Sequence, residues 1–251
     1  MTPLADAVLH GAHGARALFT TRRGGLSVAP YDSLNLGDHV GDAPAAVAAN
    51  RALVLDALRE EGLQRIAWLE QVHGSEVVDL DAWDGFAVPR ADAAVTSRRG
   101  LAACVLVADC LPVLLAAPGA VGAAHAGWRG LAGGVVENCA RALCDKAGCT
   151  PAEVQAWLGP AIGPRAFEVG DEVREAFVVS DAQASRAFLR LRAGYWLADL
   201  FTLARRRLRA FGVSAIHADD ICTVSNPHDC YSYRRDRVCG RQAGLVWIST
   251  R

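Results

Sequence analysis

Three short segments of the sequence carry side chains that could bind a metal ion. His73 follows one apolar, strand-like segment, Cys110 follows another, and His125 ends a third. Because α/β proteins place ligands at strand ends along one edge of a sheet, these three side chains could meet. Two imidazoles and a thiolate suit zinc, and three protein ligands leave a fourth position for water or substrate. The residue types therefore favour an open, catalytic zinc site.

Each of these residues also has a purely structural interpretation. A histidine at a strand end is commonly a hydrogen-bonded packing residue, and a cysteine in an apolar run behaves as a small hydrophobe. The latter interpretation suits three other cysteines: Cys104, Cys139 and Cys144. Cys110 differs from them, because Asp109 before it and Pro112 after it indicate a bend rather than a strand interior.

The segment from His125 to Gly130 opens a predicted helix and has two interpretations. It could be a tight turn between a strand and a helix. It could also direct free backbone N–H groups and the side chain of Arg129 toward an anion, because helix N-termini bind phosphate. The sequence leaves both interpretations open.

The elements that would position these residues are a mixture of strands and helices. We expect strands at 16–21, 66–72, 76–80, 91–96, 101–107, 113–117, 120–124, 154–158, 214–217 and 244–248. We expect helices at 44–61, with Asp42 as N-cap and Gly62 as the stop, and at 128–147, 171–178 and 196–211. Strands and helices alternate without a strict βαβ rhythm, which predicts layered α/β structure with mixed sheets.

Composition limits the class of protein. The chain has 251 residues, of which 52% are hydrophobic and 21% charged, enough to bury a sizeable core. No repeat, low-complexity tract or linker interrupts it, so we expect a single domain over 1–251. The formal net charge of −1 gives no strong field that would attract nucleic acid or an anionic membrane.

Targeting signals and cysteine spacing bear on the compartment. The longest apolar candidate, 101–127, is interrupted by Asp109, Pro112, Pro118 and His125 and should not span a bilayer. Residues 1–10 lack the pattern of a signal peptide, so we expect a cytoplasmic protein with reduced thiols. No CxxC pair occurs among the eight cysteines, which argues against a zinc ribbon.

A series of motifs along nearly the whole chain resembles the YfiH family. The family's members are variously called multicopper polyphenol oxidases (laccases), peptidoglycan editing factors and zinc-dependent purine nucleoside phosphorylases. The motifs are TRRGGLS at 21–27, SLNLG at 33–37, VGD at 40–42, NR at 50–51, QVHG at 71–74, ADA at 91–93, ADCLPV at 108–113, HAGWRG at 125–130, GPAIGP at 159–164, YSYRRD at 231–236 and GRQA at 240–243. Gln242 departs from the pattern, because an apolar residue is more usual at its position.

The resemblance implies one α/β domain of layered mixed β-sheets flanked by helices, and a zinc site formed by His73, Cys110 and His125. It implies phosphorolysis of adenosine, inosine and 5′-methylthioadenosine, and hydrolytic deamination of adenosine. The implied partners are a purine nucleoside and phosphate, with no nucleic acid or membrane, and the chain would be a monomer or weak homodimer. Zinc that lowers the pKa of water would suit attack on C6 of adenine.

Phosphorolysis also needs donors around phosphate and a proton-transfer group. The candidates for substrate binding are Arg23, Asn35, Arg51 and Arg129, although each arginine could equally be a surface charge. Asp109 could be a general acid or base, or could orient a metal-binding histidine.

Two other enzyme classes and a non-catalytic class compete with this interpretation. A laccase needs several coppers, yet the chain has seven histidines and no HxH pair, so only adventitious copper in the three-ligand site is expected. A peptidoglycan-precursor hydrolase would use Cys110 as nucleophile with His125 or His73 as base. A binding module without catalysis is disfavoured, because three metal-type ligands and several arginines converge on one region.

The segment from Tyr231 to Asp236 combines two tyrosines, two arginines and an aspartate. Such residues could stack on a base and hold its sugar or phosphate. They could also form a surface turn whose Arg–Asp pairs contribute little to stability. His217 and His228 are expected to be structural or surface residues.

Overall fold

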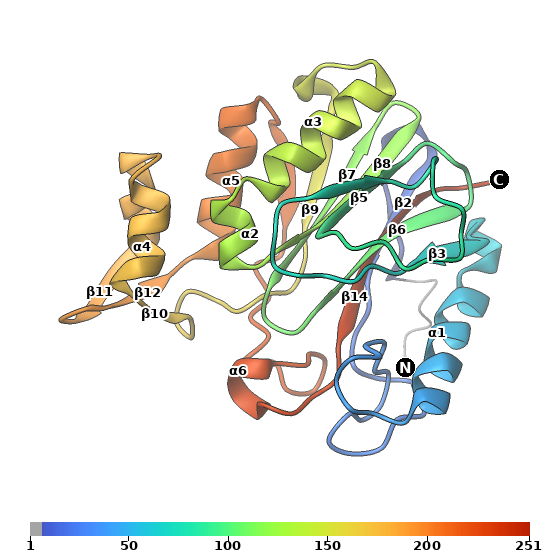
Figure 1. Ribbon diagram of the computed structural model, residues 1–251, viewed down its shortest axis with the longest axis horizontal. Coiled ribbons are helices and arrows are strands. Elements are labelled where there is room, and N and C mark those ends of the chain that lie inside the picture. The colour runs from blue at the N-terminus through green and yellow to red at the C-terminus, as the bar shows by residue number, and fades with distance from the viewer. Residues whose placement is uncertain (1–6) are drawn as a thin grey trace.

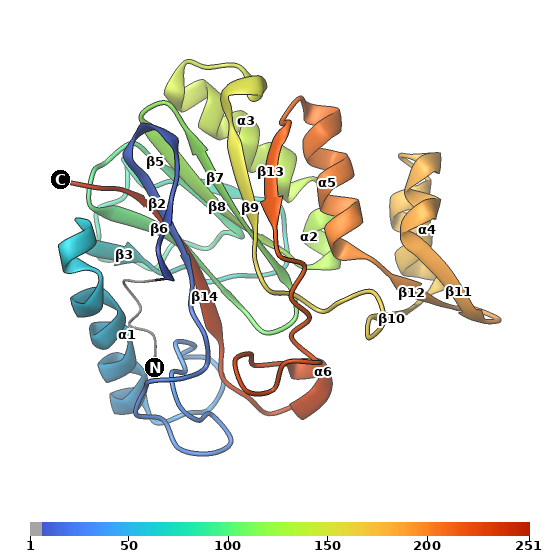
Figure 2. The same cartoon turned by 180° about the vertical axis from the view of Figure 1, so that it is seen from behind.

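The structure, a computed structural model, describes residues 7–251 and has two large mixed sheets (Figures 1 and 2). The first sheet has the order β1 (Leu9–His10), β2 (Ala15–Phe19), β14 (Gln242–Ile248), β6 (Leu101–Val107) and β3 (Arg65–Ala67). The second has the order β13 (Ala215–Ala218), β9 (Gln155–Leu158), β7 (Leu111–Ala117), β8 (Ala120–Ala126), β5 (Ala93–Thr96) and β4 (Val77–Asp79). Parallel pairs lie at the edges of both sheets and antiparallel pairs at their centres.

The two large sheets pack face to face, and helices cover their outer faces. Helix α1 (Pro44–Ala57) covers the first sheet, whereas α2 (Trp128–Ala132), α3 (Val135–Ala147) and α5 (Leu200–Phe211) cover the second. A third, small sheet of β10 (Glu168–Gly170), β12 (Tyr195–Ala198) and β11 (Phe188–Arg192) projects from one side with α4 (Asp171–Val178). Helix α6 (Tyr233–Asp236) precedes β14, and short 3-10 turns occupy Ala12–Gly14, Arg59–Glu61, Pro151–Glu153 and Ala182–Ala187.

Alternation along the strands explains the layered arrangement. In β6, Leu101, Ala103 and Val105 face the core between the sheets, whereas Ala102 and Cys104 face α1. In β7 the inward residues belong to the inter-sheet core and the others pack beneath α3 and α5. Because each strand is apolar on both faces, the sequence shows continuous apolar runs there. The expectation of layered mixed sheets flanked by helices is confirmed.

Several expected boundaries are corrected by the structure. The helix expected at 128–147 is two helices, because the chain turns at Gly133–Gly134, where Gly134 has φ 90°. The helix expected at 196–211 begins only at Leu200, with Asp199 as N-cap, because Trp196 lies in β12. The strand expected at 66–72 covers only Arg65–Ala67, and the residues after it form a loop.

The entry into α1 also differs from the expectation. Ala43, not Asp42, is its N-cap residue, and the Asp42 side chain instead accepts hydrogen bonds from Ser27 and Asn35. The helix ends at Ala57 and is followed by a short 3-10 turn before Gly62.

No helix among residues 7–251 is both long and apolar enough to cross a bilayer. The expectation that residues 1–10 are not a signal peptide falls partly on residues 1–6, which lie outside the described residues.

Candidate metal centre

Strand pairing brings Cys110 and His125 together. In the β7–β8 hairpin Pro112 pairs with His125 and Leu111 pairs with Ala126, so Cys110 lies beside the end of β8. His73 comes from a different part of the chain, the loop between β3 and β4. Gln71 fixes that loop to β6, because its side chain both donates to and accepts from the backbone of Leu106.

Asp92 connects this loop to the hairpin. Its carboxylate accepts the backbone N–H groups of Val72, His73 and Gly74 at 3.1, 2.9 and 2.7 Å. It also lies 2.9 Å from Nδ1 of His125. These contacts hold His73 at a φ of 61°, which non-glycine residues rarely adopt. They also leave Nε2 of His125 free to bind a metal, as carboxylate partners of metal-binding histidines commonly do.

The donor atoms have a spacing that fits one zinc ion. One donor atom from each of His73, Cys110 and His125 lies within 4.8 Å of the others, and Sγ of Cys110 is 3.9 Å from Nε2 of His73. Tetrahedral zinc, with Zn–S near 2.3 Å and Zn–N near 2.0 Å, would place these two atoms roughly 3.6 Å apart. Within residues 7–251 this is the one group of three or more such residues close enough to hold an ion.

Burial differs among the three ligands and leaves the group open on one side. His125 is buried, Cys110 is partly buried and His73 is exposed. A Cβ on Gly127 would lie 3.0 Å from Sγ of Cys110 and 3.1 Å from Cδ2 of His73. The absence of a side chain at this position therefore keeps space around the donor atoms.

The neighbouring charges suit metal binding. Burial raises the pKa of the Cys110 thiol. The adjacent His125 and His73 lower it by more than burial raises it, so the pKa falls to about 6. Burial lowers the pKa of His125, whereas Cys110 and Asp92 raise it to about 9. Cys110 is therefore a thiolate at neutral pH, the form that binds metals, and His125 would release a proton on binding one.

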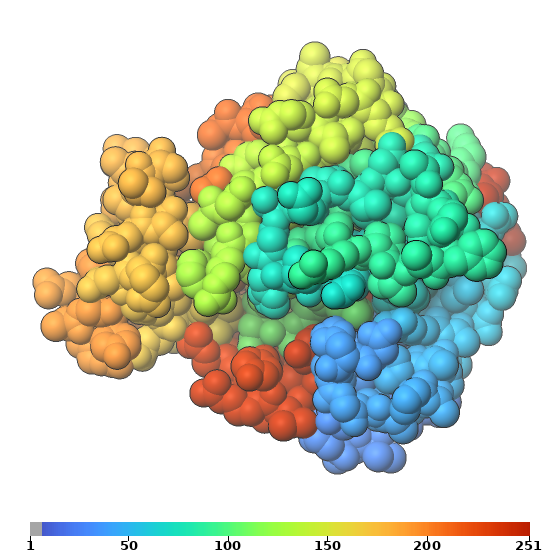
Figure 3. Space-filling view, viewed as in Figure 1, coloured from blue at the N-terminus to red at the C-terminus, as the bar shows by residue number. Residues whose placement is uncertain are grey.

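The donor group opens into a cavity of about 390 Å³. In the space-filling view the recess lies between the teal segment above and the blue and red segments below (Figure 3). Its lining combines the three candidate ligands with aromatic and basic side chains: His39, Trp128, Phe167, Tyr233, Arg234 and Arg241. Such a cavity is within the roughly 300–1,000 Å³ of small-molecule sites.

Asp109 lines this cavity, but its carboxylate contacts Thr223 and Arg234 rather than a metal-binding histidine. Its Oδ1 accepts the hydroxyl of Thr223 at 2.5 Å, and its Oδ2 accepts the backbone N–H of Arg234 at 2.6 Å. The carboxylate that orients His125 is thus Asp92, whereas Asp109 fixes the segment that carries Arg234.

Asn35 and Arg51 lie beneath the cavity rather than in its lining. Asn35 is fully buried, and its Oδ1 accepts the backbone N–H groups of Gly37 and Arg241. Arg51 donates to the carbonyl of Leu36, pairs with Asp38 and lies over the ring of Trp68.

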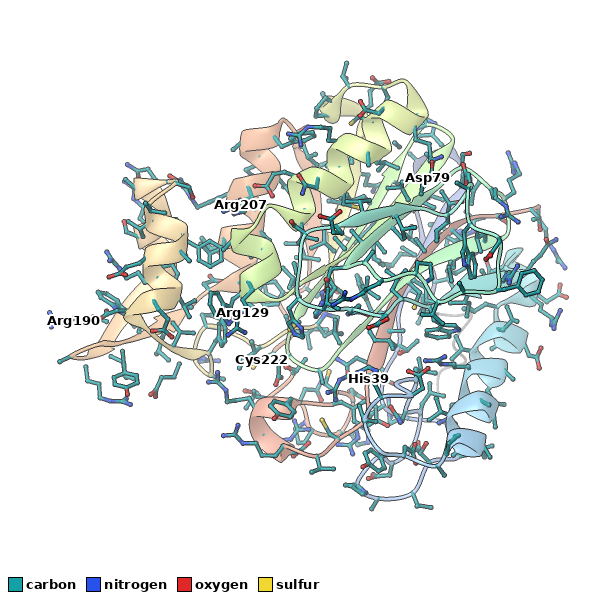
Figure 4. All side chains as sticks on the ribbon, in the orientation of Figure 1. His39, Asp79, Arg129, Arg190, Arg207 and Cys222 are labelled. Carbon is teal, nitrogen blue, oxygen red and sulfur yellow. The ribbon has the colours of Figure 1, made fainter. Side chains whose placement is uncertain are left out.

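Arg23 and Arg129 also lie outside the lining of this cavity. Arg23 forms a 2.8 Å ion pair with Asp229 and lines a second cavity. Arg129 is exposed on α2, where it lies over the ring of Trp128 (Figure 4). Substrate binding by Arg23, Asn35, Arg51 and Arg129 stays a prediction.

Sequence reasoning did not assign a role to Asp92, His39 or Arg241. Asp92 was visible in the ADA motif, and Arg241 in the GRQA motif, but neither position had a spacing that signals a contact with the centre. Within the YSYRRD segment, Tyr233 and Arg234 line the cavity. Arg235 instead donates to backbone carbonyls and to Asp236.

The sequence and the fold are similar to those of known proteins. Residues 16–249 match the model of a family described as multi-copper polyphenol oxidoreductase laccase. A relative named purine nucleoside phosphorylase from Pseudomonas aeruginosa is 50% identical over 93% of each chain. The purine nucleoside phosphorylase YfiH of Escherichia coli is 47% identical over 94% of each chain. The chain belongs to this family, which confirms its resemblance to YfiH proteins.

Solved structures show the same fold. Neisseria meningitidis protein NMB0706 superposes with a TM-score of 0.89 at 43% identity, covering 97% of this chain and 99% of that one. The Bacillus licheniformis protein YfiH superposes with a TM-score of 0.88 at 29% identity, covering 97% and 100%.

Proposed function

We propose that the protein is a zinc-dependent purine nucleoside phosphorylase. Its substrates would be adenosine, inosine and 5′-methylthioadenosine, and adenosine deamination would be a second activity of the same centre. The observation that carries the proposal is the group of His73, Cys110 and His125 at the base of one cavity. The names of relatives that cover 93–94% of this chain support the choice of substrate class.

The residues around the centre suit a nucleoside. Zinc held by the three ligands would supply a Lewis acid, which can polarise an oxygen or activate water. Trp128, Phe167 and Tyr233 contribute aromatic side chains to the cavity lining, and aromatic side chains can stack on bases. The proposed substrates are metabolites of the cytoplasm, where we expect the chain to act as a monomer or weak homodimer without nucleic acid or a membrane as partner.

The test separates phosphorolysis from deamination. Zinc-loaded protein is incubated with adenosine or inosine, with and without phosphate, and products are followed by chromatography and mass spectrometry. We expect free base and ribose 1-phosphate only with phosphate, and inosine from adenosine without it. Absence of ribose 1-phosphate with both adenosine and inosine in the presence of phosphate would refute the phosphorylase assignment for these nucleosides.

A second candidate is a cysteine hydrolase acting on a peptidoglycan precursor. The contacts that favour it are those of Cys110 with His125 and of His125 with Asp92, the order of groups in a nucleophile–base–orienting triad. Metal removal distinguishes the two candidates. A chelator should abolish phosphorolysis, whereas a hydrolase with a metal-free thiolate would keep its activity.

The polyphenol oxidase named by the family model is expected only as a minor activity. All seven histidines lie within the described residues, and two of them belong to the one candidate centre. A trinuclear copper cluster would need a second group of imidazoles. Copper could still bind this centre, since affinity rises from zinc to copper. Loading one apo preparation with either metal should give nucleoside turnover with zinc and weak phenol oxidation with copper.

A further inference from the structure

Two arginines of the cavity lining have no carboxylate partner. Arg234 and Arg241 form no ion pair with any aspartate or glutamate in the described part of the chain. Both are partly buried, and both donate through Nη1 to backbone carbonyls; Nη1 of Arg241 also contacts Sγ of Cys239 at 3.8 Å. Their remaining guanidinium N–H groups are therefore available to a ligand in the cavity.

The fold positions Arg241 through a buried network. Arg241 directly precedes β14, whose first residue Gln242 pairs with Val107, three residues before Cys110. The side chain of Asn35 accepts the backbone N–H of Arg241 at 2.8 Å. A Cβ on Gly37 would lie 2.7 Å from Cγ of Arg241, so this glycine leaves room for the stem of the arginine.

Arg234 is positioned by a different set of contacts. Asp109 accepts its backbone N–H at 2.6 Å, and its guanidinium lies 5.4 Å from the ring centre of Phe167. Its Nη1 donates to the carbonyls of Ala166 and Glu168. The carboxylate of Glu168 pairs with Arg192 at 2.6 Å, and the pKa of Glu168 is lowered mainly by Arg192 and to a smaller extent by Arg234.

We propose that Arg234 and Arg241, with His39 at the rim, form the oxyanion subsite of this cavity and bind inorganic phosphate. The assignment rests on the proposed function and deepens it. Guanidinium groups offer paired donors that match phosphate oxygens, and burial strengthens such contacts. Asp109, the carboxylate of the same lining, has both oxygens engaged, one by the hydroxyl of Thr223 and one by the backbone N–H of Arg234. Asn35 and Asp109 are then positioning residues that act through the two arginines.

Direct binding of inorganic phosphate tests the subsite without catalysis. Zinc-loaded wild type, Arg234→Gln and Arg241→Gln are titrated calorimetrically, each after circular dichroism shows a native fold. Loss of one charge-assisted contact should weaken phosphate binding about 10–100-fold in each variant. The matched control is Arg190→Gln, because Arg190 is exposed on β11, far from His39 (Figure 4), and it should bind as wild type does. Unchanged affinity in both variants, or no phosphate binding by wild type, overturns the subsite.

Kinetics separate this inference from the proposed function. If wild type binds phosphate through the two arginines but releases no ribose 1-phosphate, the subsite stands and the phosphorylase assignment fails. If it turns over nucleosides, Arg241→Gln should raise KM for phosphate about 10-fold or more while KM for the nucleoside changes less than about twofold. Equal increases in both KM values would contradict a dedicated phosphate subsite.

Asp109→Asn tests the positioning role. This variant should raise KM for phosphate, keep its zinc, and retain kcat at saturating phosphate within about threefold. A general acid or base at this position would instead lower kcat by about 10²–10⁴-fold at every phosphate concentration, which would contradict the positioning role.

Discussion

Two of the molecule's cavities have similar size but different chemistry. The first, of about 390 Å³, contains the candidate metal centre, Arg234 and Arg241. The second, of about 450 Å³, lies where β2, β9 and β13 end (Figure 2). There Arg23 is paired with Asp229, and His217 stacks on Trp157.

The comparison shows that cavity volume does not identify the reactive site. In the second cavity Arg23 and His217 already have partners within the cavity lining. In the first, Asp92 contacts Nδ1 of His125, Cys110 and His73 lie beside that histidine, and two guanidinium groups keep free donors. Hydrogen-bond donors and acceptors that lack protein partners and line the same cavity distinguish a ligand-binding site from a surface depression.

The largest contrast is expected from histidine substitutions in the two cavities. His125→Ala should reduce zinc from about one ion per chain to a small fraction, and nucleoside turnover should fall with it. His217→Ala, in the second cavity, should keep both. Zinc content by mass spectrometry and turnover by chromatography check the pair.

Cys110→Ala and His73→Ala should behave as His125→Ala does, with a native fold shown by circular dichroism. Full activity in a metal-depleted variant would refute the assignment of the centre.

The carboxylate that orients His125 gives the next largest effect. Asp92→Asn should weaken zinc binding about 10–100-fold, because an amide holds the imidazole and the N–H groups of the His73 loop less well. Asp109→Asn is the matched control and should leave zinc affinity unchanged, since Asp109 contacts Thr223 and Arg234. Competition with a chromogenic chelator measures both affinities. If only Asp109→Asn weakens zinc binding, Asp109 rather than Asp92 orients the metal-binding histidine.

Thiol reactivity should also distinguish the centre from the core. In metal-stripped protein, Cys110 should be alkylated with a rate that rises through a pH near 6 and levels above it, because its pKa is lowered. An ordinary thiol titrates near 8.5. Buried Cys104, whose pKa burial raises, should stay unmodified, and zinc should protect Cys110. Peptide mass spectrometry after iodoacetamide treatment measures each cysteine separately. If the alkylation rate of Cys110 instead rises through a pH near 8.5, as for an ordinary thiol, the neighbouring histidines do not lower its pKa.

Much of the fold followed from local patterns in the sequence. The apolar runs of β6, β7 and β8 were predictable because strands buried on both faces have no polar alternation. Helix α3 was expected as part of a longer helix, because its periodicity continues across Gly133–Gly134 and only backbone geometry reveals the break. The small sheet was missed because β11 is mostly exposed and because most of β12 was assigned to the helix that follows it.

The candidate centre was predictable for a different reason than its surroundings. His73, Cys110 and His125 are residue types that bind metals, so their chemistry suggests them as ligands, although His73 lies in the loop between β3 and β4 rather than at a strand end. Asp92, Arg234 and Arg241 are common types whose roles depend on strand register and on long-range hydrogen bonds. Arg23 and Arg51 fitted the charge requirement equally well in the sequence, and only the structure shows which arginines already have carboxylate partners.

The smallest expected effect is the sharpest test of the comparison between the two cavities. Arg23→Gln removes a guanidinium from the second cavity and breaks its ion pair with Asp229. Because that pair is partly exposed, its loss should cost little stability, about 0–1 kcal/mol. KM for phosphate should change less than about twofold, whereas Arg241→Gln should raise it about 10-fold or more.

Both variants lose one positive charge, so a general effect of net charge on phosphate affinity would be equal in the two. Phosphate titrations at fixed inosine, at low and at physiological salt, measure the difference. If Arg23→Gln raises KM as much as Arg241→Gln does, phosphate uses the arginine suggested by the sequence, and charge pairing is not what separates the two cavities.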